Sequence, residues 1–284
     1  MGMTAIEQAT IDRLVNQAYK LRRMVLDLTH QGQCGHPGGS LSLAEIMSCL
    51  YFHVLRIDPR NPRWEGRDRL ILSKGHAAPI YYAALAEAGF FPAEVLATYG
   101  QLDSILQGHP DMHTPGVDMS SGSLGQGLSP AAGIALGAKL RGKSFRVYVI
   151  LGDGECQEGQ VWEAAMAAPR FGLDNLTVIV DKNRLQLTDF TDNAIPVDPL
   201  GAKWQAFNWH VIEINGHSVP EILSAVAEAQ ATKGRPTAII AHTTKGKGVS
   251  FMEDQAIWHA KPPDDAEYQQ AIEEILLACK GELS

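Results

Sequence analysis

A glycine-rich acidic segment could bind a phosphate group together with its cation. The segment reads Gly152-Asp153-Gly154 and comes directly after the apolar run 147–151. Glycine lets backbone N–H groups approach phosphate oxygens, and a helix that opens near Glu158 would add a favourable dipole. The Asp153 carboxylate would supply a hard oxygen for a divalent cation that neutralises the phosphates. The segment therefore predicts a phosphate and metal site.

A second polar residue follows the next apolar run and could bind the same cation. Asn183 comes after the run 176–180, about one strand–helix–strand unit beyond Asp153. With the backbone carbonyl of Leu185, these residues would give three protein oxygens, and two diphosphate oxygens and a water would complete the octahedron that Mg²⁺ prefers. In the alternative interpretation, Gly-Asp-Gly forms only a turn and Asn183 only caps a helix. The metal hypothesis depends on each motif following a strand.

Histidines supply candidate proton-transfer groups. Gly-His pairs occur at His36, His76 and His109, and His259 lies in the later segment 258–263. A histidine after glycine is expected on a loop with exposed backbone, where its imidazole can exchange protons with substrate hydroxyls. Any one of them alone could be an ordinary exposed histidine. Their order around Gly-Asp-Gly and Asn183 favours a functional set.

Apolar runs that alternate with helical patterns predict the scaffold that positions these groups. The runs 69–73, 147–151, 176–180, 211–214 and 237–241 are typical of buried strands. Helical patterns occupy 11–28, 43–55, 81–89, 130–140, 158–168, 199–207, 220–231 and 266–280, and the Gly- and Pro-rich segment 31–40 is expected to be a loop. The alternation predicts an α/β fold with a mainly parallel sheet between helices.

The chain is expected to form one domain over residues 1–284, because no composition break marks a linker. In parallel sheets, ligands bind beyond the carboxyl ends of the strands. The segments that follow the five runs are rich in glycine and charge: Ser-Lys-Gly-His, Gly-Asp-Gly-Glu, Asp-Lys-Asn-Arg, Asn-Gly-His and His-Thr-Thr-Lys-Gly-Lys-Gly. This edge of the sheet is therefore the expected site.

Composition and charge argue against several classes of protein. The formal net charge is -8 and no long run of Lys and Arg occurs, which argues against binding to nucleic acid or an anionic membrane. No stretch approaches the roughly 20 apolar residues that span a bilayer, and the N-terminus does not read as a signal peptide. The four cysteines form no Cys-x-x-Cys pair. We expect a cytoplasmic protein with reduced thiols.

These motifs, in this order, resemble the N-terminal half of transketolase, from about Ala18 to His259. Gly-Asp-Gly followed by Asn183 resembles the thiamine diphosphate motif, although many members have Asn-Asn where this chain has Lys182-Asn183. The segment that begins at Gly122 reads Gly-Ser-Leu-Gly-Gln-Gly, whereas the family usually has proline at the position of Ser123. The resemblance implies a three-layer thiamine-diphosphate-binding fold.

The resemblance also implies roles for individual residues. His36 and His259 would contact the donor ketose near the bond that breaks, and His109 would hold a terminal hydroxyl. Glu158 and Glu163 match positions near the subunit interface. The residues that would bind thiamine diphosphate are His76, Gly122, Leu124, Asp153, Gly154 and Asn183. Those that would bind Mg²⁺ or Ca²⁺ are Asp153, Asn183 and Leu185.

The implied activity is transfer of a two-carbon ketol unit from a ketose phosphate to an aldose, as in the pentose phosphate pathway, with thiamine diphosphate as electron sink. A full-length transketolase carries its catalytic glutamate and its sugar-phosphate arginines after the segment matched here. This chain ends at Ser284, soon after its last helical pattern, which reads as a natural end. We therefore expect one subunit of a split enzyme, active with a C-terminal transketolase subunit in an α2β2 assembly.

Several alternatives stay open. The chain could be a fragment, or it could belong to a related enzyme that uses apulose phosphate, a sulfosugar or the donor of dihydroxyacetone synthase. The α subunit of a 2-oxoacid dehydrogenase shares Gly-Asp-Gly but generally lacks the Gly-His motifs, and deoxyxylulose-phosphate synthase is normally one long chain. A non-catalytic binding protein is disfavoured because Asp153, Asn183 and the histidines are all present.

Overall fold

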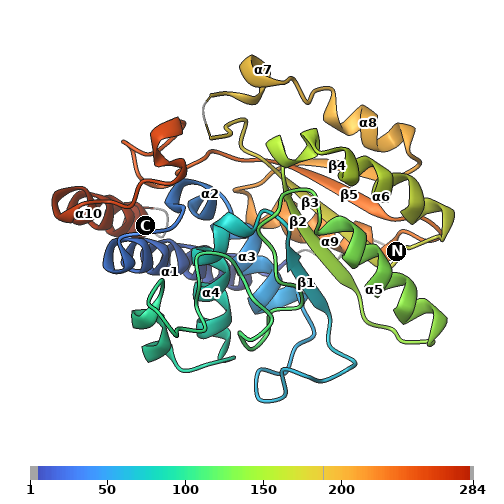
Figure 1. Cartoon of the computed structure of the whole chain (residues 1–284), viewed down its shortest axis with the longest axis horizontal. Coiled ribbons are helices and arrows are strands. Elements are labelled where there is room, and N and C mark those ends of the chain that lie inside the picture. Colours follow the sequence, from blue (N-terminus) through green and yellow to red (C-terminus); the bar gives the residue numbers. More distant parts are fainter. Residues whose placement is uncertain (1–5, 188, 282–284) are drawn as a thin grey trace.

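The centre of the molecule is a parallel sheet. The computed structural model describes residues 6–187 and 189–281. The five strands are β1 Arg69–Leu72, β2 Val147–Gly152, β3 Leu176–Lys182, β4 His210–Asn215 and β5 Thr237–His242. Their spatial order is β1-β2-β3-β5-β4, and every pairing is parallel (Figure 1). All five predicted strands are therefore confirmed. Residues 1–5 and 282–284, which bear on the expectations about the two chain ends, lie outside the described residues.

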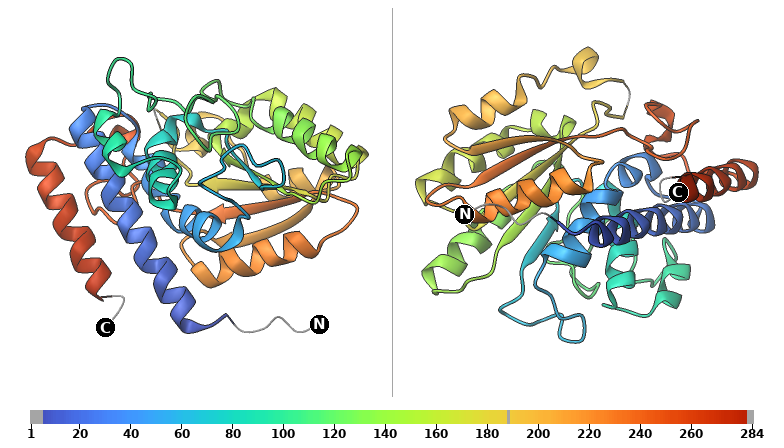
Figure 2. Two further views of the ribbon diagram at one scale, coloured as in Figure 1. Left: turned by 90° about the horizontal axis from the view of Figure 1, so that it is seen from below. Right: turned by 180° about the vertical axis from the view of Figure 1, so that it is seen from behind.

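Side chains of each strand alternate between two apolar cores, because successive residues of a strand point to opposite faces. Val147 and Val149 of β2 belong to one core, whereas Tyr148 and Ile150 belong to the other. The first core is covered by α5 Leu128–Leu140, α6 Gly159–Arg170 and α8 Leu200–Ala206. The second is covered by α1 Gln8–Gly32, α3 Ala44–Cys49, α4 Ala78–Ala88 and α9 Val219–Ala231. The predicted three-layer α/β fold is confirmed (Figure 2).

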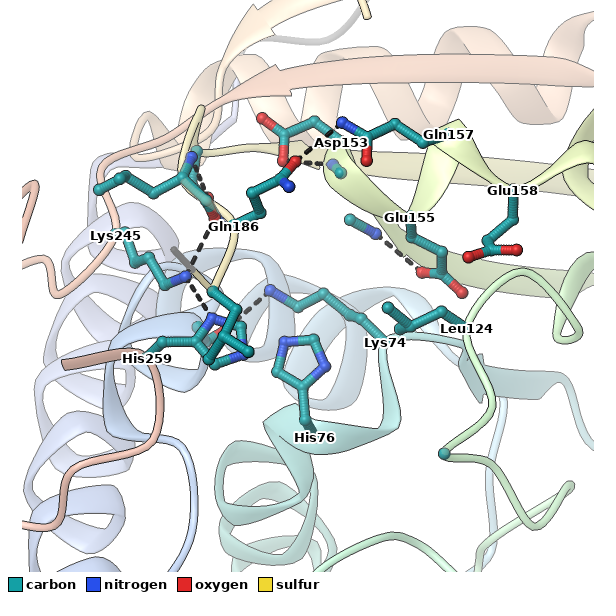
Figure 3. A pocket seen from close by; sticks show the side chains of 17 residues that line it. Lys74, His76, Leu124, Asp153, Glu155, Gln157, Glu158, Gln186, Lys245 and His259 are labelled. Carbon is teal, nitrogen blue, oxygen red and sulfur yellow. Dashed lines mark hydrogen bonds between the residues drawn. The ribbon is translucent and has the colours of Figure 1, made fainter. Parts of the chain in front are cut away.

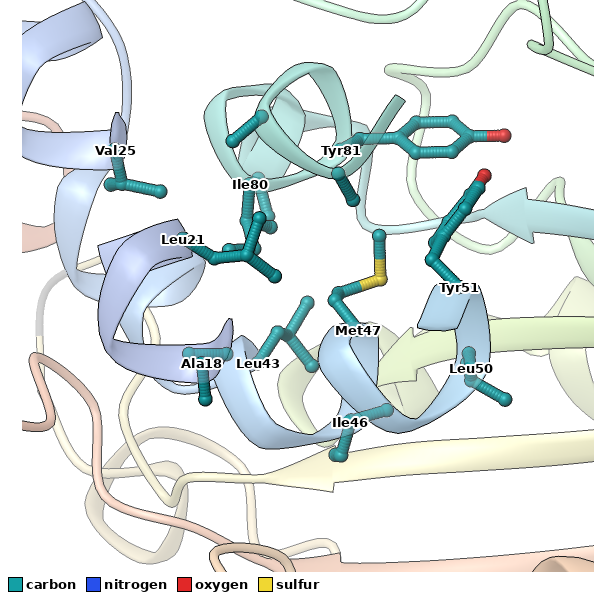
Figure 4. Close-up of a cluster of buried hydrophobic side chains, with 14 of the residues drawn as sticks. Ala18, Leu21, Val25, Leu43, Ile46, Met47, Leu50, Tyr51, Ile80 and Tyr81 are labelled. Carbon is teal, nitrogen blue, oxygen red and sulfur yellow. The ribbon is translucent and has the colours of Figure 1, made fainter. Parts of the chain in front are cut away.

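The long helix α1 has the apolar face that its sequence predicts. Figure 4 shows Leu21 and Val25 on the side of α1 that faces Leu43 and Ile80, and all four side chains are fully buried. The predicted helix 43–55 is α3 followed by a π-helical turn at Leu50–Val54. The last helix, α10 Asp265–Gly281, lies beside α1 in both views (Figures 1 and 2).

The structure contains short helices that the sequence analysis did not predict. The glycine- and proline-rich segment 31–40 contains α2 Pro37–Leu41, so the prediction of a plain loop there was wrong. Proline is tolerated at a first helical position because its missing N–H would have no partner there. Another short helix is α7 Thr191–Ala194. No described helix is long and apolar enough to cross a membrane, and all four cysteines are free thiols.

The buried central strand gives a direct test of the core. We expect Ile179→Ala on β3, where the side chain is 1% exposed, to lower the free energy of unfolding by about 2–5 kcal/mol, because truncation leaves a cavity. Ile179→Val should cost about 0.5–1.5 kcal/mol. Ile257→Ala, at a position that is 67% exposed, is the control and should stay within about 0.5 kcal/mol. Urea titration measures the free energy of unfolding of all three variants. Equal losses of this free energy in the three variants would contradict the described packing.

Candidate functional site

A cavity of about 320 Å³ opens at the carboxyl edge of the sheet, where the ligand rule places a site (Figure 3). Most of the residues predicted for the site line it: His76, Gly122, Leu124, Asp153, Gly154, Asn183, Leu185 and His259. The other two predicted residues, His36 and His109, do not line the cavity but belong to the histidine cluster described next. The structure thus gathers the whole predicted set at one place.

The four histidines of the separate motifs form one cluster. The ring of His36 lies 5.2 Å from that of His76, 6.3 Å from that of His109 and 5.3 Å from that of His259, between centroids. The rings of His76 and His259 stack at 5.0 Å. His76 lies in the turn Gly75–Ala77, whose flanking residues are buried, so the expected exposed loop was wrong at this position.

Burial favours the neutral form of three of these imidazoles, those of His36, His76 and His259. Burial, then the neighbouring His109 and Lys245, lowers the pKa of His36 to about 4. Burial and the Lys245 ammonium lower the pKa of His259 to about 3, and burial with Lys74 lowers the pKa of His76 well below its usual value. A neutral imidazole can both donate and accept a hydrogen bond, which suits it to substrate hydroxyls. The buried Nδ1 of His36 has no hydrogen-bond partner among the described residues.

The Asp153 carboxylate has the properties of a cation ligand. It accepts hydrogen bonds from the N–H groups of Gly154 (2.8 Å) and Arg184 (2.6 Å). Burial and the nearby Asp181 raise the pKa of Asp153 to about 6. A buried carboxylate whose charge is disfavoured by its surroundings is stabilised by a cation. The site therefore fits a divalent metal ion.

The other two predicted ligands lie in the same cavity. The Asn183 side-chain oxygen accepts from the Leu185 N–H at 3.1 Å. The Leu185 carbonyl accepts from the Lys245 ammonium at 3.0 Å. No group of three His, Cys, Asp or Glu side chains suited to a metal occurs in the described part of the chain. A cation here would depend on Asp153 together with amide, carbonyl and phosphate oxygens.

Two buried lysines escaped the sequence analysis. Lys74, in the segment after β1, forms an ion pair with Asp181 and donates to the Gly39 carbonyl at 2.8 Å. Lys245, in the segment after β5, contacts Nδ1 of His259 at 2.7 Å, and burial with Lys74 lowers the pKa of Lys245 to about 8. Both segments were recognised as strand ends, but their lysines were not singled out. A lysine within four residues after an apolar run was the available signal.

A buried glutamate fixes the loop that begins at Gly122. Glu155 accepts from the N–H groups of Gly125 (2.8 Å) and Gly152 (3.0 Å) and from the Ser73 hydroxyl. Burial raises the pKa of Glu155. The loop approaches so closely that a Cβ at Gly127 would lie 2.4 Å from that of Ser73. Glu155 therefore joins the loop to the ends of β1 and β2, a role that sequence reasoning missed.

The two glutamates expected near a subunit interface lie on one helix. Glu158 is the N-cap residue of α6 and lines the cavity. Glu163 lies on the same helix. Glu158 therefore places the first turn of α6 at the edge of the cavity.

The Lys74–Asp181 pair yields a stability prediction. We expect Lys74→Met to lower the free energy of unfolding by about 3–5 kcal/mol, because it leaves a buried carboxylate without its counter-charge. Lys139→Met is the matched control, since Lys139 pairs with Asp174 at the surface and should contribute about 0–1 kcal/mol. Denaturant titrations measure both losses. Equal losses would contradict the importance of the buried pair.

Comparison with known proteins identifies the family. The model of the family described as "Transketolase, thiamine diphosphate binding domain" matches residues 13–277. The 6-deoxy-6-sulfo-D-fructose transketolase subunit of Clostridium sp. is 44% identical over 263 residues, which cover 92% of this chain and 96% of that protein. An apulose-4-phosphate transketolase subunit from Actinobacillus succinogenes is 44% identical over 266 residues, 93% of this chain and 96% of that one.

Longer relatives match over part of their length. Rat transketolase is 45% identical over 273 residues, which are 95% of this chain but 43% of that protein. The crystal structure of transketolase from Campylobacter jejuni superimposes with a TM-score of 0.88 at 33% identity, covering 93% of this chain and 43% of that one. The chain belongs to the transketolase family and is its thiamine diphosphate binding part.

Proposed function

We propose that this chain is one subunit of a two-chain transketolase that moves a two-carbon ketol unit from a ketose phosphate to an aldose. The observation that supports this most is that the three candidate cation ligands share one cavity with members of the histidine cluster. The described residues form one sheet between two helical layers, which supports a single diphosphate-binding domain over residues 1–284.

The proposed cation ligands and phosphate contacts lie on the strand ends. Asp153, Asn183 and the Leu185 carbonyl would hold Mg²⁺ or Ca²⁺, and Gly154 with His76 would contact the diphosphate. Lys245 adds a buried positive charge beside them. The two residues that would line the rings of the cofactor are Gly122 and Leu124, both in the cavity wall. When bound, thiamine diphosphate supplies an electron sink for cleavage of the bond next to the ketose carbonyl.

The histidines would act on the sugar. His36 and His259 are proposed to contact the donor near the bond that breaks, and His109 its terminal hydroxyl. Because the lowered pKa values keep His36 and His259 neutral, each ring can both donate a hydrogen bond to a sugar hydroxyl and accept one from it.

A second subunit would complete the site. The chain spans 43% of full-length relatives, whereas it spans nearly all of relatives that are named as subunits. Leu187 lines the cavity and is 62% exposed, and Leu124, another lining residue, is 40% exposed. Apolar side chains at the rim of a functional cavity are typical of a surface that a partner covers. A C-terminal transketolase subunit in an α2β2 assembly would cover them.

Two other sugars are candidates for the donor. The relatives with matching length are named for 6-deoxy-6-sulfo-D-fructose and for apulose 4-phosphate. We propose these two donor types as alternatives to xylulose 5-phosphate. A role in the pentose phosphate pathway follows only if xylulose 5-phosphate is the donor.

Activity should require the partner. We expect the chain alone, with thiamine diphosphate and Mg²⁺, to transfer no ketol unit to ribose 5-phosphate, and the chain mixed with the product of its neighbouring gene to do so. The measurement is the initial rate at which the ketose two carbons longer forms from ribose 5-phosphate, with xylulose 5-phosphate, 6-deoxy-6-sulfo-D-fructose or apulose 4-phosphate as the donor, each assayed separately. A full rate from the chain alone would refute the two-subunit proposal. The donor with the highest kcat/KM decides between the substrate classes.

Loss of the proposed cation ligand should weaken cofactor binding. We expect Asp153→Asn to raise the dissociation constant of thiamine diphosphate at fixed Mg²⁺ at least about tenfold, because a neutral amide attracts the cation less strongly. Asp174→Asn is the control, since Asp174 precedes β3, at the end away from the site, and pairs with Lys139. Isothermal titration of the assembled enzyme measures both constants. An unchanged constant in Asp153→Asn would remove Asp153 from the metal site.

A further inference from the structure

The segment Asn-Gly-His after β4 has no part in the proposed chemistry, although it lies at the same edge of the sheet. Its histidine, His217, donates from Nδ1 to the Glu45 carboxylate at 2.9 Å, and its Nε2 accepts from the Thr244 backbone N–H at 2.9 Å. The Thr244 N–H can only donate, so Nε2 is the acceptor of this contact and Nδ1 is the donor to Glu45. The two contacts fix both the tautomer and the orientation of the ring.

Glu45 holds a second side chain in the same way. It accepts from the Arg22 guanidinium at 2.7 Å, and the Nε of Arg22 donates to the Lys247 carbonyl at 3.0 Å. Burial alone would raise the pKa of Glu45, but Arg22 and His217 together lower it to about 2. The carboxylate is therefore ionised and holds both donors in place.

The two side chains that Glu45 holds bind the backbone at either side of Lys245. His217 holds Thr244, and Arg22 holds Lys247. Between these two points, the Gly246 N–H donates to the Gly38 carbonyl at 3.0 Å. The backbone that carries Lys245 is thus tied to α1, to α3 through Glu45, and to the segment after β4.

We infer that His217 and Arg22, joined through Glu45, are positioning residues that set where the Lys245 ammonium lies in the site. Lys245 contacts the Leu185 carbonyl and Nδ1 of His259 (Figure 3). Both contacts are short and directional, so a shift of the backbone at Thr244 moves the ammonium away from both groups at once. The three positioning side chains do not themselves line the cavity, so they act through Lys245.

The inference rests on the proposed function for its effect on cofactor binding, but its first test does not need the cofactor. We expect His217→Ala to speed hydrogen exchange of the Thr244 amide about fivefold, because the amide loses its acceptor. His210→Ala is the matched control, because His210 begins β4, at the strand end away from this segment, and also bonds to a glutamate, Glu228, at 2.7 Å. An unchanged exchange rate at Thr244 in His217→Ala would overturn the proposed hold on the backbone.

The second test is a double-mutant cycle on the enzyme assembled with its partner subunit. Lys245→Met keeps the side-chain length and removes the charge, and it should raise the dissociation constant of thiamine diphosphate about tenfold. His217→Ala should raise it about fivefold in the unsubstituted background but less than about twofold in the Lys245→Met background, since the shared contact is already lost. The same factor in both backgrounds would mean that His217 acts independently of Lys245, and the inference would fall.

A conservative variant separates positioning from folding. His217→Asn places its amide group near the position of Nδ1, so it can still donate to Glu45, but it is too short to accept from the Thr244 N–H. If His217→Ala does not fold, His217→Asn takes its place in the same cycle, with the same outcomes for and against. Absence of thiamine diphosphate binding by the unsubstituted assembly would contradict the proposed function instead, and the exchange test at Thr244 would still decide whether His217 holds this backbone.

Discussion

The ion pair between Lys74 and Asp181 lies at the carboxyl edge of the sheet, at the point where the segments after β1, β3 and β5 meet. Two opposite charges in a protein interior are tolerated only when their remaining hydrogen-bonding capacity is satisfied. The Asp181 carboxylate meets this condition by also accepting from Ser42, Thr243 and Asn183. One buried carboxylate thereby fixes the start of three segments that build the site.

The site that these segments build is electrostatically asymmetric. Two buried lysines and a set of neutral imidazoles surround a buried carboxylate, Asp153, whose own ionisation is disfavoured. A polyanion that arrives with a divalent cation satisfies both sides of this arrangement, because the cation stabilises Asp153 and the lysines stabilise the anion. The neutral rings of His36 and His259 can hydrogen-bond to hydroxyl groups without adding charge to the site.

The sequence predicted the strands and the position of the site well, because apolar runs and the residues that end them are local features. Asp153 and Asn183 could be placed together since parallel strands end at one edge. Burial of a charged side chain is decided by distant segments, so Glu155 could not be recognised, and the only local signal for Lys74 was its position after an apolar run. Arg22 interrupts the apolar face of α1, and its role could not be predicted because its partner, Glu45, lies on another helix. The helix α2 was missed because its glycines and proline have low helix propensity, and tertiary packing compensates for this.

The strand order determines when the segments of the candidate site can come together during synthesis of the chain. β5 leaves the ribosome after β4, yet it inserts between β3 and β4 and separates them in the finished sheet. Until β5 is in place, β4 has no neighbour, and neither Thr243 nor Lys245 can reach the edge where the other loops end. Pairings between segments that are far apart in sequence form late, because the intervening chain must first be ordered. Thr243 and Lys245 therefore join the candidate site only when β5 has paired with β3 and β4, so the site is complete only after the sheet is complete.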